Sequence, residues 1–218
     1  KQDHPKCMTK ISENETVISR QLKALKKCNI KDVIITTGFL DDILIDYCYS
    51  LNLDLNYTFV NNPIYDKTNY IYSIYLSNKY IDDDILLMHG DLVFDSAILE
   101  NIIDEKNSCM TVSSKIPLPS KDFKAVIKEG TIRKIGIDFF ENALTAQPLY
   151  KINKGDWKIL MESIINYCEI GKINVYAENA FNDISYKLTL YPFDYEKLLC
   201  SEIDNVEDLN KVKQVIKF

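Results

Sequence analysis

The chain has 218 residues, of which 46% are hydrophobic, and its formal net charge at pH 7 is −6. This is enough apolar material for one full core, while the negative charge and the lack of a lysine- or arginine-rich block argue against a nucleic-acid or anionic membrane surface. No apolar run in the sequence approaches the roughly 18 residues of a membrane-spanning helix, so we expect a cytoplasmic protein that acts on small molecules.

The first part of the chain alternates between helical and extended patterns. Helices are expected at residues 15–29, 41–51 and 70–80, and strands at residues 33–37 and 55–60. The first helix carries apolar residues on one face and lysines on the other, and Thr68 and Asn69 can cap the third. Such alternation indicates parallel βαβ units with right-handed crossovers.

Residues 85–88 are four consecutive apolar residues, around which the chain is organised. The run is too short for a buried helix and lacks polar alternation, so it predicts a central parallel strand covered on both faces. Gly90 lets the backbone approach a ligand, and Asp91 puts a carboxylate where open α/β sheets bind ligands. An equally good alternative is that Asp91 only begins a turn or caps the next helix. His89 is expected to be a packed or hydrogen-bonded residue rather than a base.

The second part of the chain adds antiparallel signals to this alternation. Helices are expected at residues 94–105, 156–167 and 206–216, a short helical turn at 176–181, and strands at 109–113, 145–152 and 188–192. Residues 123–127 and 131–135 flank Lys128-Glu129-Gly130, which is a hairpin signature. An antiparallel insertion is therefore expected at about residues 114–145.

Two prolines should limit the strands that contain them. Pro148 is expected to keep its strand away from a central hydrogen-bonded position, and Pro192 is expected to end the last strand. The whole pattern predicts an α/β fold with a mainly parallel, doubly wound, Rossmann-like sheet and a small antiparallel insertion. Residues 1–218 are expected to form one domain.

Several segments share their order and spacing with one enzyme superfamily. They are the Pro5-Lys6 step, residues 21–25 and 30–39, residues 62–65 and 68–75, the pair Gly90-Asp91, and residues 202–209. The chain thereby resembles the nucleotidyltransferases, and most closely the phosphocholine and 2-aminoethylphosphonate cytidylyltransferases. The resemblance implies a nucleotide-diphospho-sugar transferase-like fold. It also implies a strand and a glycine-rich loop ahead of Pro5, so we expect the natural protein to continue upstream of Lys1.

The resemblance implies a magnesium-dependent reaction. A phosphate or phosphonate oxygen of the acceptor attacks the α-phosphorus of CTP, and pyrophosphate leaves. Asp91 and Asp204 are implied as Mg²⁺ ligands, and Lys6 as the cation that meets the phosphates. The alternative for Asp204 is capping of the last helix, which Asn205 could do equally well, and for Lys6 it is a solvated lysine.

Further residues are implied to bind the nucleotide. They are Gly38, Thr68, Asn69, Ser73 and Gly90, together with Lys6. The alternative for the first four is structural: a glycine at a strand end, two helix caps and a packed serine.

The acceptor is implied to be a small phosphorylated or phosphonate amine: 2-aminoethylphosphonate, phosphocholine or phosphoethanolamine. Aromatic faces and acids recognise an ammonium group. The candidates are Tyr150, Tyr176, Glu178, Asn179 and Asp183, of which Glu178-Asn179 resembles a loop near the acceptor. Acids are more evident than tryptophan, which slightly favours a primary amine over choline.

Other functions are weighed against this one. A sugar-1-phosphate nucleotidyltransferase would share Lys6, Asp91 and Asp204 but use a hydroxyl-rich pocket. A glycosyltransferase fits less well because residues 82–84, three aspartates, precede a strand instead of following one. From another class, the chain could be a non-catalytic nucleotide-binding module. The expected partners are CTP and the amine, with no nucleic acid and no membrane, and homodimerisation is left open.

Overall fold

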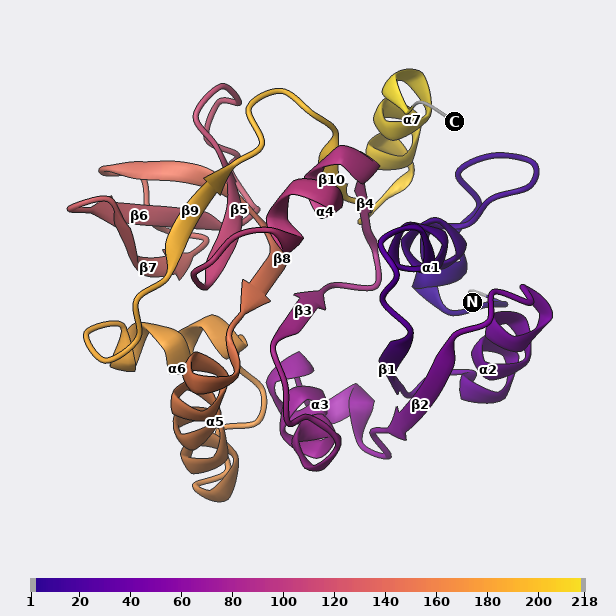
Figure 1. Ribbon diagram of the computed structural model, residues 1–218, viewed down its shortest axis with the longest axis horizontal. Helices are drawn as coiled ribbons and strands as arrows, with labels where there is room; N and C mark the ends of the chain where they lie inside the picture. Colours follow the sequence, from indigo (N-terminus) through magenta and orange to yellow (C-terminus); the bar gives the residue numbers. More distant parts are fainter. Residues whose placement is uncertain (1–2, 217–218) are drawn as a thin grey trace.

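The computed structural model describes residues 3–216, in which helices and strands alternate as expected (Figure 1). The α-helices are α1 (Val17–Lys27), α2 (Asp41–Ser50), α3 (Tyr70–Ser77), α4 (Ser96–Ile103), α5 (Lys154–Glu169), α6 (Ala177–Ile184) and α7 (Val206–Val215). The strands are β1 (Asp32–Thr37), β2 (Asn56–Asn61), β3 (Ile85–Met88), β4 (Leu92–Phe94), β5 (Cys109–Ser113), β6 (Lys124–Lys128), β7 (Thr131–Gly136), β8 (Ala143–Ile152), β9 (Tyr191–Asp194) and β10 (Cys200–Glu202). Short 3₁₀ helices are η1 (Lys6–Met8), η2 (Tyr65–Lys67) and η3 (Asn78–Tyr80). Residues 1–2 and 217–218 of the expected domain lie outside the described residues. Across residues 3–216, no helix combines the length and apolar character needed to cross a membrane.

The strands form one larger sheet and two strand pairs. The larger sheet has the order β7-β6-β8-β5-β9, with β3 also paired to β8. β1 pairs with β2, and β4 pairs with β10. The pairs β1–β2 and β5–β9 are parallel, and the others are antiparallel. The α/β class is confirmed, and the antiparallel part extends beyond the insertion because β8 runs antiparallel to β3, β5 and β6.

The predicted hairpin is formed by β6 and β7. Its turn residues Glu129 and Gly130 both have positive φ angles, 53° and 74°. Positive φ at both central positions is typical of the two-residue turn whose twist matches that of the flanking strands. The hairpin then leads into β8, which carries the chain back through the centre of the larger sheet (Figure 1).

Pro148 lies in the middle of β8 at the centre of this sheet, so the expectation that it would stay off a central position was wrong. The register between β5 and β8 shifts at Thr111, whose hydroxyl donates to the carbonyls of Gln147 at 2.8 Å and Leu149 at 3.3 Å. The Pro148 carbonyl accepts a hydrogen bond from the backbone N–H of His89 at 3.1 Å. A bulge of this kind lets proline, which has no N–H, enter a sheet.

Two other boundaries differ from the predictions. Pro192 lies inside β9 rather than after it, which is tolerated because β9 is an edge strand of the sheet. Phe94 ends strand β4 instead of opening a helix. The helix begins two residues later because the Asp95 side chain caps it by accepting from the backbone N–H of Ala97 at 3.1 Å.

Two hydrophobic clusters lie on opposite faces of the strands. Helices α3, α5 and α6 supply one cluster, and α1, α2 and α4 supply the other. Side chains alternate along β8 between them, with Tyr150 in the first and Leu149 in the second. Along β3, Leu87 packs against the first cluster and Leu86 against the second. Strand β3 is therefore apolar on both faces, as predicted, although each of its residues stays partly exposed. The expectation that it would be a central parallel strand was wrong, because its described partner is β8, which runs antiparallel to it.

Candidate functional site

Two acidic residues that are far apart in sequence meet at one edge of the fold. Asp91 lies between β3 and β4, and Asp204 follows β10. β4 and β10 form an antiparallel ladder, and the backbone N–H of Ile203 donates to the Asp91 carbonyl at 3.1 Å. This ladder fixes the two acids relative to each other. Asp91 lies beyond the carboxyl end of β3, where the sequence predicts the site.

Lys6 lies between these two carboxylates. Its Nζ donates hydrogen bonds to Asp91 Oδ2 and, at 2.5 Å, to Asp204 Oδ1. Burial lowers the pKa of Lys6, but the hydrogen bonds to Asp204 and Asp91 outweigh it, so the net pKa is raised. The structure thus brings together the three residues proposed as catalytic, with a charged ammonium between two acids.

Asp91 also lies beside a hydrogen-bonded pair, His89 and Glu202. His89 Nδ1 lies 2.8 Å from Glu202 Oε1, and one ligand atom from each of His89, Asp91 and Glu202 falls within 4.8 Å of the other two. Burial raises the pKa of Glu202, the His89 hydrogen bond lowers it, and the charges of Asp91 and Asp204 raise it further, for a net rise. The histidine is therefore hydrogen-bonded and packed, as expected.

The donors of this site suit a hard divalent cation. Asp91 and Asp204 already converge on one positive charge, the Lys6 ammonium. Carboxylate oxygens are the protein ligands that Mg²⁺ prefers, and it commonly takes one or two of them together with phosphate oxygens and water. The residues present thus fit the ion that the resemblance implies.

A cavity of about 190 Å³ opens beside Asp204. Its walls are Tyr70, His89, Lys121, Asp122, Phe123, Ile137, Tyr176, Glu202 and Asp204. The Tyr176 ring lies edge-on to Phe123 at 5.1 Å between centroids and 6.2 Å from the Tyr70 ring. Burial, and then the charges of Asp204 and Asp208, raise the pKa of Asp122. The cavity therefore joins aromatic rings to several acids and one lysine.

Only one of the five predicted acceptor residues, Tyr176, lines this cavity. Glu178 is buried and accepts hydrogen bonds from Tyr70 Oη and, at 2.5 Å, from Tyr150 Oη. Glu178 and Tyr150 instead line a small apolar cavity of about 30 Å³. Asp183 points elsewhere and accepts from Tyr167 Oη at 2.6 Å.

Asn179 is likewise outside the cavity walls. It lies on α6 with an exposed side chain, and its backbone N–H donates to the Tyr176 carbonyl at 3.1 Å. Sequence adjacency to Glu178 suggested a shared role, but neighbouring residues on a helix point in different directions.

The candidate nucleotide residues after β1 serve the local structure. A Cβ atom at Gly38 would lie 2.6 Å from the Tyr65 ring, so only glycine fits there. The buried Asn62 amide donates to Thr68 Oγ1 at 2.9 Å and to Ser73 Oγ at 3.2 Å. These contacts fix the loop between β2 and α3.

The other two candidates have similar contacts. Asn69 caps α3 by accepting from the backbone N–H of Tyr70 at 2.7 Å. A Cβ atom at Gly90 would meet the Cys7 Cβ at 3.4 Å, an ordinary contact. The structural alternatives therefore account for the local contacts of these residues, and their binding of a nucleotide stays a prediction.

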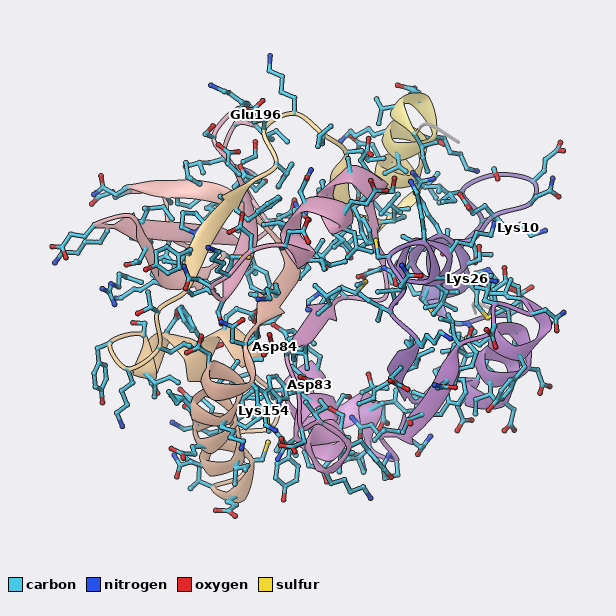
Figure 2. The ribbon with its side chains drawn as sticks, in the orientation of Figure 1. Lys10, Lys26, Asp83, Asp84, Lys154 and Glu196 are labelled. Carbon is cyan, nitrogen blue, oxygen red and sulfur yellow. The ribbon has the colours of Figure 1, made fainter. Side chains whose placement is uncertain are left out.

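Two of the aspartates at 82–84 contact the first residue of helix α5, Lys154. Figure 2 shows Asp83 and Asp84 near Lys154. The backbone N–H of Lys154 donates to Asp84 Oδ1 at 2.8 Å, and its Nζ lies 3.0 Å from Asp82 Oδ1. Acids at the start of a helix interact favourably with its unpaired N–H groups. Asp82 and Asp84 are therefore engaged at the start of α5.

Several cavity residues were missed in the sequence. They are Tyr70, Lys121, Asp122, Phe123 and Glu202. A signal existed for Glu202, because residues two apart on an extended chain face the same way and Glu202 precedes Asp204 by two. Asp122 and Phe123 stand at the entrance to the predicted hairpin, where an insertion can complete a pocket.

The sequence of the chain is similar to one protein family and to two curated enzymes. Residues 2–132 match the family described as "Domain of unknown function (DUF6564)". The chain is 26% identical over 119 residues to the CTP:phosphoglutamine cytidylyltransferase of Campylobacter jejuni, covering 52% of this chain and 46% of that protein. It is 23% identical over 111 residues to the CMP-5'-(3-aminopropyl)phosphonate synthase of Streptomyces rubellomurinus, covering 51% and 18%. The chain thus spans less than half of each curated relative.

The fold has close counterparts among solved structures. That of the CTP:phosphocholine cytidylyltransferase from Streptococcus pneumoniae superimposes with a TM-score of 0.78 at 19% identity, covering 99% of this chain and 91% of that one. The expected nucleotide-diphospho-sugar transferase-like fold is thereby confirmed.

Proposed function

Because this chain belongs to the family described as "Domain of unknown function (DUF6564)" and has the fold of the nucleotidyltransferases, we propose that it is a cytidylyltransferase. It transfers CMP from CTP to a small phosphorylated or phosphonate amine and releases pyrophosphate, with Mg²⁺ as cofactor. The observation that carries this proposal is the Lys6 bridge between Asp91 and Asp204 beside a cavity walled by aromatic rings and acids.

The nucleotide half of the reaction uses the charged end of the site. Asp91 and Asp204 would hold Mg²⁺, which would supply positive charge to neutralise the triphosphate. The Lys6 ammonium would then donate hydrogen bonds to phosphate oxygens. Positioning and charge neutralisation supply most of the rate in such transfers, so no covalent intermediate on the protein is required.

The acceptor half uses the cavity. Tyr70, Phe123 and Tyr176 offer aromatic rings, and Asp122 and Glu202 offer carboxylates to an ammonium group. The phosphate or phosphonate end then faces Asp204 and Lys6, where the transfer takes place. The names of the two curated relatives, which refer to a phosphoglutamine and an aminopropylphosphonate, agree with this class of acceptor.

A sugar phosphate fits the same walls less well. Sugar recognition calls for convergent hydrogen-bond donors and acceptors. The cavity also brings the rings of Tyr70, Phe123 and Tyr176 to its walls, and aromatic faces attract an ammonium group. These rings favour the amine over the sugar 1-phosphate.

Lys121 favours a second candidate within the amine class. Among the described residues that line the cavity, it is the one lysine or arginine, beside three acids, His89, Ile137 and three aromatic rings. A phosphorylated amino acid has a carboxylate as well as an ammonium group, and Lys121 can pair with that carboxylate. The name of one relative refers to phosphoglutamine, which is a phosphorylated amino acid.

The test is an assay of pyrophosphate release by the full-length natural protein with CTP and Mg²⁺. The acceptors are 2-aminoethylphosphonate, phosphoethanolamine, phosphocholine, O-phosphoserine and glucose 1-phosphate. We expect release with at least one amine and none with the sugar phosphate. Turnover of the sugar phosphate alone would overturn the proposal, and CTP binding without turnover of any acceptor would favour the non-catalytic module. The cytoplasmic location, the homodimer and the single domain with an insertion at 114–145 stay predictions.

A further inference from the structure

We propose that Glu178 is a positioning residue that fixes the ring of Tyr70 as one wall of the acceptor cavity. This inference rests on the proposed function, because the wall matters only if the cavity holds the acceptor. It assigns Glu178 a place behind the cavity wall, in contrast to the direct contact with the amine that the sequence suggested.

The carboxyl group of Glu178 is held at both oxygens. Glu178 lies on α6 with 5% of its surface exposed. Tyr70 Oη from α3 donates to Oε2, and Tyr150 Oη from β8 donates to Oε1 at 2.5 Å. Two different elements therefore lock the orientation of this side chain.

No positive charge compensates for burying this acid. Within residues 3–216, Glu178 forms no ion pair with a basic side chain. The remaining neighbours around it are mostly apolar, such as Leu87, Ile164 and Phe181. Burying a carboxyl group among apolar side chains is costly, and a well-packed apolar residue would cost less. A role for its two hydrogen bonds is therefore expected.

Tyr70 connects this buried group to the cavity. It is the first residue of α3, and its ring lies 4.5 Å from the His89 ring and 6.2 Å from the Tyr176 ring. The Tyr70 ring lines the cavity, whereas its hydroxyl is taken by Glu178 on the other side. Glu178 does not line the cavity and so reaches the acceptor only through Tyr70.

The hydrogen bond from Tyr70 to Glu178 matters because the Tyr70 ring can attract an ammonium group only when its face is turned toward the cavity. An ammonium group is attracted to the face of a ring, and the attraction is lost when the ring rotates away. A tyrosine whose hydroxyl is bound at a buried carboxyl group loses less rotational entropy when the acceptor binds. Removing either end of the Glu178–Tyr70 hydrogen bond should therefore weaken acceptor binding and leave CTP binding unchanged.

The experiment compares Glu178→Leu, which removes both hydrogen-bonding oxygens, Tyr70→Phe and the double variant in the full-length protein. Each single change should raise the KM for the amine acceptor about fivefold, the factor that one ordinary hydrogen bond contributes on average, with the KM for CTP changed less than about twofold. The double variant should show no further rise, because both changes break the same bond. A purely structural role would raise both KM values together.

Asp183→Asn is the matched control. Asp183 lies on the same helix and also accepts from a tyrosine hydroxyl, that of Tyr167, but away from the cavity. It should leave the acceptor KM unchanged. The inference is overturned if Glu178→Leu and Tyr70→Phe leave the acceptor KM unchanged or if their effects add. If Glu178→Leu does not fold, Tyr70→Phe, which removes one hydroxyl only, decides alone. A wild-type protein that turns over no amine contradicts the proposed function, whereas turnover with unchanged variants contradicts only this inference.

Discussion

Two acidic regions flank the same cavity, and they handle charge in opposite ways. At the Lys6 site, Asp91 and Asp204 remain 18% and 58% exposed and share a protonated amine. At the Glu178 site the carboxyl group is buried, its partners are neutral hydroxyls, and burial raises its pKa to about 8. The first region holds a positive charge between partly exposed acids, whereas the second favours the neutral acid and holds a fixed geometry. Nearby carboxyl groups can therefore take separate roles because their environments differ.

The largest expected effect comes from removing charge at the exposed region. Asp91→Asn or Asp204→Asn should lower turnover by about 10²–10³-fold, as for loss of one electrostatic stabiliser of a transition state, and should leave the fold intact because side-chain volume barely changes. Pyrophosphate release with saturating CTP and Mg²⁺ measures this, with circular dichroism as the check on folding. Asp46→Asn, an exposed acid on α2, is the control and should behave as the wild type. Normal turnover in both site variants would show that the exposed acids do not act in catalysis.

The buried region should reveal itself in the pH dependence of stability. An acid whose pKa is about 8 in the folded state and near 4.5 in the unfolded state binds more protons when folded. Its contribution to stability is therefore present at low pH and is lost as the pH rises from about 4.5 to about 8. Between pH 5 and pH 8 this loss should be about 3–4 kcal/mol.

Denaturant unfolding at pH 5, 6, 7 and 8 measures this dependence in the wild type and in Glu178→Gln. Glutamine does not titrate in this range, so the decline in the free energy of unfolding should be shallower in the variant by that amount. Parallel curves for the two proteins would mean that Glu178 ionises as an ordinary exposed acid does, and the contrast between the two regions would fail.

The charged region was the easier one to predict from sequence. Asp91 follows an apolar strand, Asp204 precedes a helix, and Lys6 belongs to a short motif, so each residue carried a local signal. The ladder between β4 and β10 then brought the two acids together. A strand of three residues such as β4 is too short to show a pattern, which explains why the helix was expected to begin at Phe94.

The cavity walls could not be predicted in the same way. Tyr70, Phe123 and Tyr176 come from separate elements, and in a chain with fourteen tyrosines no single one stands out. Glu178 was recognised as important, but the sequence cannot show that Tyr70 lies between it and the cavity. The position of Pro148 could not be predicted either, because the bulge at Thr111 that admits it forms only when β5 and β8 pair.

The smallest effect is expected at the rim of the cavity. Lys121 is exposed, so a charge pair with an acceptor carboxylate should contribute only about 0.2–1 kcal/mol. Lys121→Met should therefore lower kcat/KM for O-phosphoserine by about two- to fivefold and leave phosphoethanolamine, which lacks the carboxylate, unchanged. Equal losses with both acceptors would place Lys121 at the shared phosphate instead.

On this proposal, Asp91 and Asp204 form the cation site of a nucleotide-binding enzyme. Titration of the full-length protein with Mn²⁺, followed by electron paramagnetic resonance with and without CTP, tests it most directly without relying on turnover. We predict that CTP strengthens Mn²⁺ binding in the wild type and that Asp91→Asn and Asp204→Asn each weaken this CTP-dependent binding at least tenfold, the loss of one charged ligand. Equal Mn²⁺ affinity in the wild type and both variants, with CTP present, would contradict the account.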